Sequence, residues 1–193
     1  MKNKPNVIFL GPDEGFKSSK RILDGFANII KIEPNASSVL KHLSYVDAII
    51  DASMKLKIDK HIIDKAKNLK IISCATTGSS HIDSEYTKKR GIEVRTLKED
   101  KDLIKNLTPA AELSWALLMN CARNLNHAIN HVQNGNWDRE KFPGIMIKGK
   151  TIGIIGCGRI GTWMSKYASA FGMNIIGFDP YIKQNQTKIK LVD

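Results

Sequence analysis

A short glycine motif constrains the fold of this chain more than any other feature. Gly156, Gly158 and Gly161 have the spacing GxGxxG, directly after the apolar run 151–155 and before a segment with the pattern of a helix. Asp179 follows Gly161 by 18 residues, at the end of a second apolar run, 174–178. Strand, glycine turn, helix, strand and acid in this order are typical of a dinucleotide-binding unit.

Each part of the motif has a physical function. Gly156 permits a tight turn, Gly158 lets the backbone approach a pyrophosphate, and Gly161 lets the helix pack closely on the strand. The helix N-terminus offers unpaired N–H groups and a positive dipole end to phosphates. Asp179 can accept hydrogen bonds from a ribose diol, and its charge would repel a 2′-phosphate. We therefore predict NAD, and not NADP, as the cofactor.

The charge and cysteine content argue against other classes of protein. The formal net charge of +11 suggests an anionic partner, but 24 of the 30 basic residues are lysines scattered along the chain. Nucleic-acid recognition favours clustered arginine, so we expect none here. No apolar run approaches the length of a membrane helix, and the three cysteines lack metal or disulfide spacing. These features predict a cytoplasmic protein with no membrane contact and no metal.

The first hundred residues alternate strand-like and helix-like segments. The expected strands are 7–10, 29–32, 47–51, 69–74 and 92–95, and the expected helices are 18–28, 37–42, 59–67 and 84–90. Asp83 is placed as the N-cap of the last helix and Gly91 as the residue past its C-cap. This alternation predicts a parallel sheet covered by helices, the flavodoxin-like form of the α/β class.

We expect residues 1–95 to form a first domain, 96–107 a polar connector, and 108–193 part of a second domain. A long helix is predicted to begin at Pro109, with Thr108 as its N-cap, and to end at Asn134-Gly135. The helix should bury an apolar stripe throughout its length, formed by Leu117, Cys121, Leu125, Ala128 and Val132. His127 and His131 have the i, i+4 spacing of metal ligands, but with no acidic partner motif we favour a solvated or hydrogen-bonded pair.

The motifs together resemble the D-isomer-specific 2-hydroxyacid dehydrogenase family, of which phosphoglycerate dehydrogenase is a member. The stretches that carry the resemblance are 74–83 with 89–94, 108–113 with 122–125, and 135–161 ending at Asp179-Pro180-Tyr181. The resemblance implies a flavodoxin-like N-terminal domain followed by a Rossmann NAD-binding domain. It also implies an active site between two α/β domains, a 2-oxo or 2-hydroxy acid substrate and a homodimer.

The resemblance also assigns roles to particular residues. The loop after the fourth strand would bind the substrate carboxylate through backbone N–H groups, and the residues in that loop are Thr76, Thr77, Gly78 and Ser79. The cofactor would be held by Gly156, Gly158, Arg159, Ile160, Gly161, Asp179 and Pro180, with Arg159 and Ile160 flanking the pyrophosphate.

Family members reduce the oxo acid with an arginine, a glutamate and a histidine that lie downstream of the glycine motif. No arginine follows Arg159 here and no histidine follows His131. We expect these catalytic residues to lie beyond Asp193, in a longer chain or in a complementing C-terminal polypeptide, and the Rossmann domain to be incomplete. The alternatives are an inactive NAD-binding or protein-interaction fragment, and a basic α/β module that binds nucleic acid.

Overall fold

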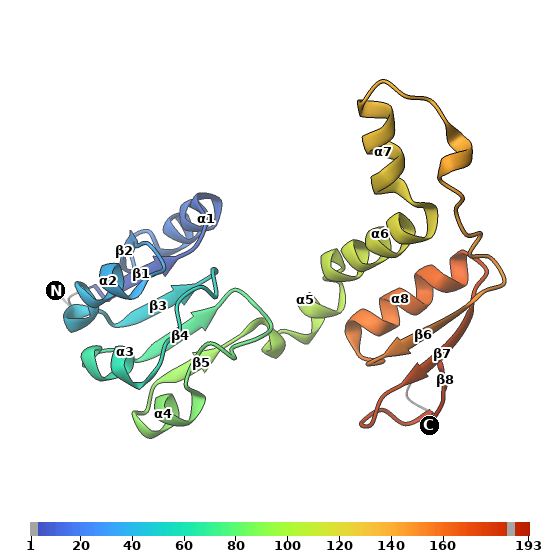
Figure 1. Ribbon diagram of the computed structural model, residues 1–193. Coiled ribbons are helices and arrows are strands. Elements are labelled where there is room, and N and C mark those ends of the chain that lie inside the picture. Colours follow the sequence, from blue (N-terminus) through green and yellow to red (C-terminus); the bar gives the residue numbers. More distant parts are fainter. Residues whose placement is uncertain (1–3, 185–187) are drawn as a thin grey trace. The chain divides into compact units, whose positions relative to one another are not determined.

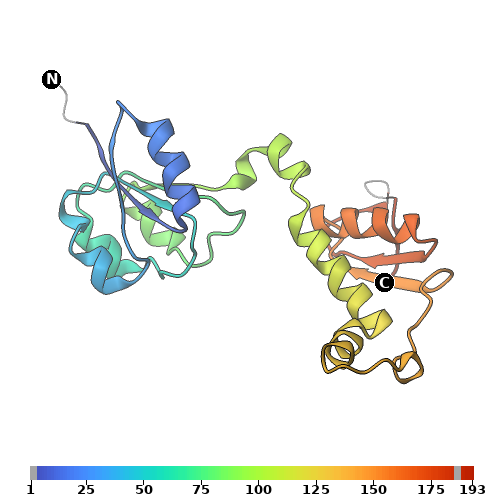
Figure 2. The same ribbon diagram turned by 90° about the horizontal axis from the view of Figure 1, so that it is seen from above.

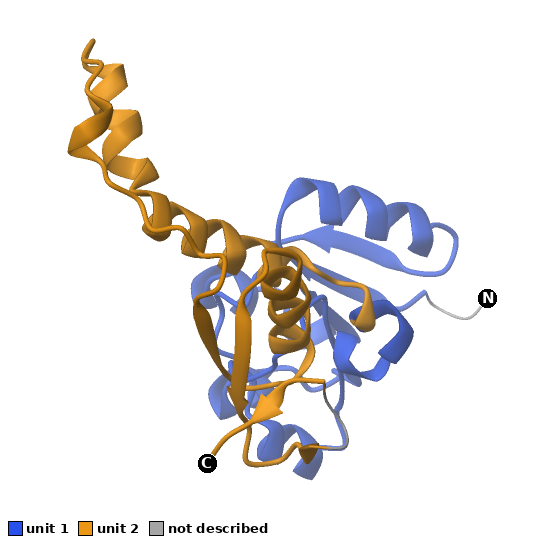
Figure 3. Cartoon of the chain, turned by 90° about the vertical axis from the view of Figure 1, so that its right-hand side faces the viewer, with its two compact units in different colours: residues 1–104 blue, residues 105–193 orange. Residues whose placement is uncertain are grey.

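The computed structural model describes residues 4–184 and 188–193, and the chain divides into two compact units. Unit 1 comprises Met1–Ile104 and unit 2 comprises Lys105–Asp193, as coloured in Figure 3. The boundary falls inside the stretch 96–107. Of the predicted C-terminal tail, residues 185–187 lie outside the described part.

Unit 1 is built on a five-stranded parallel sheet in the order β2-β1-β3-β4-β5 (Figure 1). Its strands are β1 (Asn6–Leu10), β2 (Asn28–Lys31), β3 (Ala48–Asp51), β4 (Ile71–Cys74) and β5 (Glu93–Arg95). The order 2-1-3-4-5 is the flavodoxin-like arrangement, and it confirms the predicted fold class for this part. The inner strands are apolar because a parallel sheet is covered on both faces.

The helices of unit 1 are α1 (Asp13–Leu23), α2 (Ala36–Leu40), α3 (Lys60–Lys65) and α4 (Ser84–Lys89), with a 3₁₀ turn at Leu43–Tyr45. Helix α2 contacts α3 and α3 contacts α4, whereas α1 lies beside β2 (Figure 2). The predicted caps of α4 are confirmed, because the Asp83 carboxylate accepts from Tyr86 N–H at 2.9 Å and Gly91 has a φ of +67°.

The predicted start of the first helix was wrong by five residues. Helix α1 begins at Asp13, directly after Pro12, and the acidic residues Asp13 and Glu14 occupy its first turn. Gly15 makes this early start sterically feasible, because a Cβ there would lie 2.9 Å from Cζ of Phe9 on β1. The helix ends before Gly25, which has a φ of +80°.

The core of unit 1 lies between its sheet and helices. Fully buried side chains from the strands and from the helical layer form one cluster, which includes Ile8, Leu10, Val39, Leu43, Ile49, Ile63 and Ile72. The stretch that follows β5 is largely helical, with a 3₁₀ turn at Leu97–Glu99 and helix α5 (Lys101–Lys105). Thr96 and Glu99 form a capping box at the 3₁₀ turn.

Unit 2 begins with two helices where the sequence predicted one. Helix α6 (Pro109–Arg123) ends at Asn124, which has a φ of +51°, and α7 (Leu125–Gln133) continues in a new direction (Figure 1). Asparagine tolerates this left-handed conformation, and its side-chain amide donates to the Pro143 carbonyl oxygen at 2.7 Å. The predicted end at Asn134-Gly135 is confirmed.

The predicted burial of the apolar stripe was also wrong. Leu117, Cys121, Leu125 and Val132 are exposed in the chain by itself. The break at Asn124 divides the stripe between two helices. The contacts that α6 does make come from another face, where Trp115 packs against Tyr167 of α8 and against Phe171, the C-cap of α8, at ring-centroid distances of 5.9 and 5.0 Å.

The sheet of unit 2 has three parallel strands among the described residues, in the order β6-β7-β8. The elements are β6 (Thr151–Ile155), α8 (Arg159–Ala170), β7 (Asn174–Phe178) and β8 (Lys190–Leu191), preceded by a 3₁₀ turn at Arg139–Lys141. Strands β6 and β7 have the predicted bounds. The small core includes Ile154, Cys157 and Ile189, whereas Ile155 at the end of β6 is 91% exposed.

Candidate functional site

The glycine loop between β6 and α8 has the geometry that a nucleotide site needs. Gly156 has a φ of +90°, so the tight turn depends on a residue without a side chain. A Cβ on Gly161 would lie 2.2 Å from the carbonyl oxygen of Gly156 and 3.0 Å from Cγ2 of Ile154. The first helical turn therefore packs on the strand as closely as the sequence predicted.

Gly158 differs from the other two glycines, because the protein itself does not require it. Its φ is −70°, and a Cβ there would meet no protein atom within 4 Å. The space beside Gly158 is open at the N-terminus of α8. A bound dinucleotide requires such an open approach to the backbone at the second glycine of the motif.

The N-terminus of α8 supplies donors to this space. The first hydrogen bond of the helix runs from Thr162 N–H to the Gly158 carbonyl oxygen at 2.8 Å. The N–H groups of Arg159, Ile160 and Gly161 precede it, so they have no acceptor within the helix. Together with the helix dipole they form an anion-binding end.

Asp179 lies directly after β7, and its carboxylate contacts the backbone of the glycine loop. One carboxylate oxygen, Oδ2, accepts from Cys157 N–H at 2.8 Å, and Oδ1 accepts from Tyr181 N–H at 2.9 Å and Ile182 N–H at 3.2 Å. The hydrogen bond from Tyr181 lowers the pKa of Asp179 most, and those from Cys157 and Ile182 add to it against the opposing effect of desolvation. The carboxylate is therefore ionised at neutral pH.

The other predicted cofactor residues lie around the same loop. The guanidinium of Arg159 donates to the Leu107 carbonyl oxygen, and the indole of Trp163 donates to that of Lys105 at 3.2 Å. The bond to Leu107 engages the side chain of Arg159, whose backbone N–H has no acceptor within the helix. Ile160 is exposed, and Pro180 is exposed directly after Asp179.

Unit 1 carries the predicted carboxylate-binding loop at the C-terminal end of β4. The Thr76 hydroxyl donates to the Gly78 carbonyl oxygen at 2.7 Å, and Ile82 N–H donates to that of Ser79 at 3.0 Å. Met54 is the neighbour of Gly78, with its Cε 3.8 Å from the position of a Cβ there. The loop is thus folded on its own backbone beside the loop that follows β3.

Sequence reasoning missed a buried polar pair at this end of the sheet. His81 Nε2–H donates to Asp51 Oδ2 at 2.8 Å, and Asp51 is completely buried at the end of β3. The only signal in the sequence was an acid that closes an apolar strand. No rule of spacing links that acid to a histidine 30 residues further along the chain.

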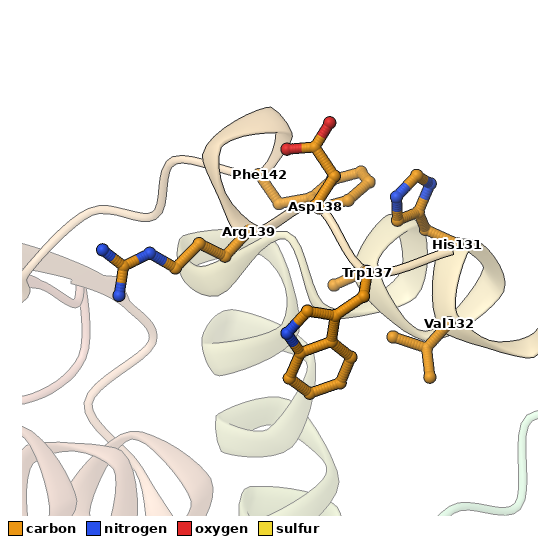
Figure 4. Close-up of a pocket in the computed structure, with 7 residues that line it drawn as sticks. His131, Val132, Trp137, Asp138, Arg139 and Phe142 are labelled. Atoms are coloured by element: carbon orange, nitrogen blue, oxygen red, sulfur yellow. The ribbon is translucent and has the colours of Figure 1, made fainter. Parts of the chain in front are cut away.

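Within the described ranges 4–184 and 188–193, no group of three or more His, Cys, Asp or Glu side chains could hold a metal. His131 lies instead against the ring of Phe142, at a centroid distance of 5.1 Å, in a small apolar pocket between α7 and the following loop (Figure 4). Among the same residues, none of the helices has the length and apolar character of a membrane span.

Comparison with known proteins identifies the family. Residues 17–99 match the catalytic domain of D-isomer-specific 2-hydroxyacid dehydrogenases, and residues 115–193 match the NAD binding domain of the same family. The chain belongs to this family. The predicted resemblance is thereby confirmed, and so is NAD as the cofactor of the second domain.

The relatives are enzymes longer than this chain. A D-3-phosphoglycerate dehydrogenase of Methanocaldococcus jannaschii is 41% identical over 140 residues, which are 71% of this chain and 26% of the relative. A hydroxypyruvate reductase of Thermotoga maritima is 34% identical over 155 residues, 80% of this chain and 49% of the relative. The chain thus spans between about a quarter and a half of these 2-hydroxyacid dehydrogenase relatives.

Solved structures show the same fold. The TT0316 protein of Thermus thermophilus has a TM-score of 0.80 at 25% identity, over 97% of this chain and 59% of that protein. The NAD-dependent formate dehydrogenase of Staphylococcus aureus, solved in complex with NAD, has a TM-score of 0.83 at 23% identity, over 97% and 60% of the two chains. The second likeness concerns the fold alone.

Proposed function

We propose that this protein transfers a hydride between NAD(H) and a 2-oxo or D-2-hydroxy acid, and that the present chain contributes the NAD site and the site for the substrate carboxylate. The observation that carries the proposal is the glycine loop, in which Gly158 is required by no protein contact and faces open space at the start of α8. Membership of the 2-hydroxyacid dehydrogenase family supports the reaction class.

In this proposal the residues of unit 2 hold the cofactor. The backbone N–H groups of Arg159, Ile160 and Gly161 bind the pyrophosphate, and the carboxylate of Asp179 with the adjacent Pro180 borders the adenosine ribose. When bound, NADH would supply the hydride and NAD⁺ would accept it. Because Asp179 is ionised, it would repel a 2′-phosphate, which favours NAD over NADP.

The residues of unit 1 bind the acid. The backbone of Thr76, Thr77, Gly78 and Ser79 orients the carboxylate, and Gly78 leaves the space that an anion needs near the amides. We assign proton transfer to no histidine of the described residues. His81 donates to Asp51, and His131 lies against Phe142.

The first test of the proposal is NADH binding followed by turnover. Gly158→Val should abolish NADH binding, because a branched side chain would occupy the place of the pyrophosphate. Asp179→Ala should weaken NAD more than NADP. Oxidation of NADH with a panel of 2-oxo acids then tests the reaction. NADH binding without turnover would favour the alternative of an inactive binding fragment, and salt-sensitive DNA binding without NADH binding would favour the nucleic-acid module.

We also propose a homodimer that forms through α6, α7 and the following loop. Exposed apolar side chains gather on these elements, among them Leu113, Leu117, Leu125, Ile129, Val132 and Trp137. Trp137, which borders the pocket of Figure 4, is 88% exposed. Such a patch is typical of an interface. Sedimentation equilibrium tests this, and a monomer at micromolar concentration would contradict it.

Two further assignments belong to the same proposal. A complementing polypeptide would extend the sheet of unit 2 along β6, which is an edge strand among the described residues and carries the exposed Ile155. Co-purification of a second polypeptide with the native protein tests this. We place the protein in the cytoplasm, which is supported by three free cysteines, Cys74, Cys121 and Cys157.

A further inference from the structure

The carboxylate of Asp51 connects two loops that follow neighbouring strands. Its Oδ2 accepts from His81 Nε2–H at 2.8 Å, in the segment after β4. Its Oδ1 accepts from Ser53 N–H at 2.8 Å, from the Ser53 hydroxyl at 2.9 Å and from Met54 N–H at 3.1 Å, in the segment after β3. One buried acid therefore fixes both segments at the edge of the sheet that carries the Thr76–Ser79 loop.

The burial of this pair is costly unless its hydrogen bonds are complete. Asp51 is 0% exposed and the side chain of His81 is 9% exposed. A buried carboxylate is tolerated only when several donors surround it, and the loss of one leaves charge without compensation. Replacing a buried ion pair by apolar residues of similar volume is often neutral or stabilising. A role in stability alone therefore does not explain the pair.

The pair also controls the side chain that adjoins the loop. The two hydrogen bonds from Ser53 and Met54 N–H hold Met54 at a φ of +56°, a conformation that few residues other than glycine adopt. In this conformation the Met54 methyl group lies 3.8 Å from the Cβ position of Gly78. Asp51 thus positions Met54, which adjoins Gly78. Its hydrogen bond with His81 holds the segment that follows the Thr76–Ser79 loop.

We propose that Asp51 and His81 are positioning residues, which hold the Thr76–Ser79 loop in the shape that binds a carboxylate. The inference rests on the proposed function, which assigns that loop to the substrate. Neither side chain touches the substrate in this account. Their effect is on the affinity for the acid and not on the affinity for NAD, because the NAD site is built from unit 2.

One atom of the pair makes a matched test available. His81 Nδ1 is buried and has no hydrogen-bond partner in the described part of the chain. Because the proton is on Nε2, Nε2 is the ring nitrogen that donates to Asp51. His81→Gln places an amide N–H donor near the position of Nε2 without the second ring nitrogen, whereas His81→Leu keeps the volume and removes the donor.

The experiment uses oxalate as the probe for the loop and follows the amide resonances of Gly78 and Ser79 in ¹⁵N-labelled chain. In the unmodified protein we expect oxalate to shift both resonances. His81→Leu should weaken oxalate at least tenfold, and His81→Gln should stay within about threefold of the original affinity. Ile63→Val is the control, because it removes a buried methyl group from helix α3 of the same unit and changes no hydrogen bond of the pair. It should lower the melting temperature and leave oxalate affinity unchanged.

The outcomes separate the inference from the proposed function. Unchanged oxalate affinity in a folded His81→Leu protein would overturn the positioning role. Absence of oxalate shifts in the unmodified chain would overturn the assignment of the loop, and with it the proposed function in unit 1. If His81→Leu does not fold, Ser53→Ala replaces it, since it removes the hydroxyl bond to Asp51 and otherwise only the bond that Ser53 Oγ accepts from Lys55 N–H at 3.2 Å. A two- to threefold weakening is then expected, and no change would again refute the inference.

Discussion

Substitution by alanine should have different effects at Gly161 and at Gly158. At Gly161 it should lower stability, and at Gly158 it should lower the affinity for NADH. At Gly161 the added Cβ would lie 2.2 Å from the Gly156 carbonyl oxygen, which belongs to the backbone and cannot rotate away. Overpacking costs about 1–3 kcal/mol, and the overlap with backbone places this variant at the top of that range. The gain in helix propensity, about 1 kcal/mol, offsets only part of this. We expect Gly161→Ala to lower the free energy of unfolding of unit 2 by about 2 kcal/mol.

Gly158→Ala is the matched control, because no protein atom lies within 4 Å of its added Cβ. Its stability should stay within about 0.5 kcal/mol of the unmodified chain. Its NADH affinity should fall, since the methyl group enters the space proposed for the pyrophosphate. The pair therefore separates a glycine needed by the fold from one needed by the ligand.

Tryptophan fluorescence is a suitable assay for this pair. Trp115, Trp137 and Trp163 all belong to unit 2, so urea unfolding followed by their emission reports on that unit alone. NADH affinity is measured separately by calorimetry. Equal stability of the two variants, or unchanged NADH affinity in Gly158→Ala, would refute the division of roles within the loop.

Three shorter predictions follow from other contacts. The three backbone donors, Tyr181 first, lower the pKa of Asp179, so its stabilising effect is complete above the ordinary pKa of 3.8 and is lost as the pH falls through the lower folded value. Asp179→Asn should therefore flatten the acid end of the stability profile of unit 2, and an unchanged slope would contradict this. At pH 8 iodoacetamide should modify the exposed Cys121 and spare the buried Cys74. Burial, together with the charge of Asp51, raises the pKa of the Cys74 thiol to about 11. Equal labelling of the two cysteines in mass spectrometry would count against this. At Asn124, with a φ of +51°, valine should destabilise the break between α6 and α7 by about 1–2 kcal/mol more than glycine in urea unfolding, and equal midpoints would show that the break is not strained.

The bounds of helix α1 show how a local sequence pattern can mislead. The sequence analysis placed this helix at 18–28, five residues later than its start in the structure. The actual start at Asp13 depends on the absence of a Cβ at Gly15, which lets the helix cross close to the ring of Phe9. Such an approach cannot be read from a helical pattern, since it involves a strand.

The sequence by itself determined the parts of this protein whose chemistry is local. Gly156 adopts a positive φ, which glycine tolerates. Asp83 is the N-cap of the helix that follows it. The apolar runs 151–155 and 174–178 form paired strands. Each of these depends on a few consecutive residues. For that reason the strand, glycine turn, helix and strand around Gly156 and the flavodoxin-like alternation were predicted correctly.

Only the tertiary structure decided the features that join distant residues. Asp51 accepts a hydrogen bond from His81, which lies 30 residues later in the sequence. Arg159 donates to Leu107, which lies 52 residues earlier. The exposure of the stripe on α6 and α7 depends on a single left-handed residue, Asn124, and on which elements the helices then face. Hydrogen bonds and burial between separate strands and helices have no periodicity in the sequence, because they arise only when the elements pack.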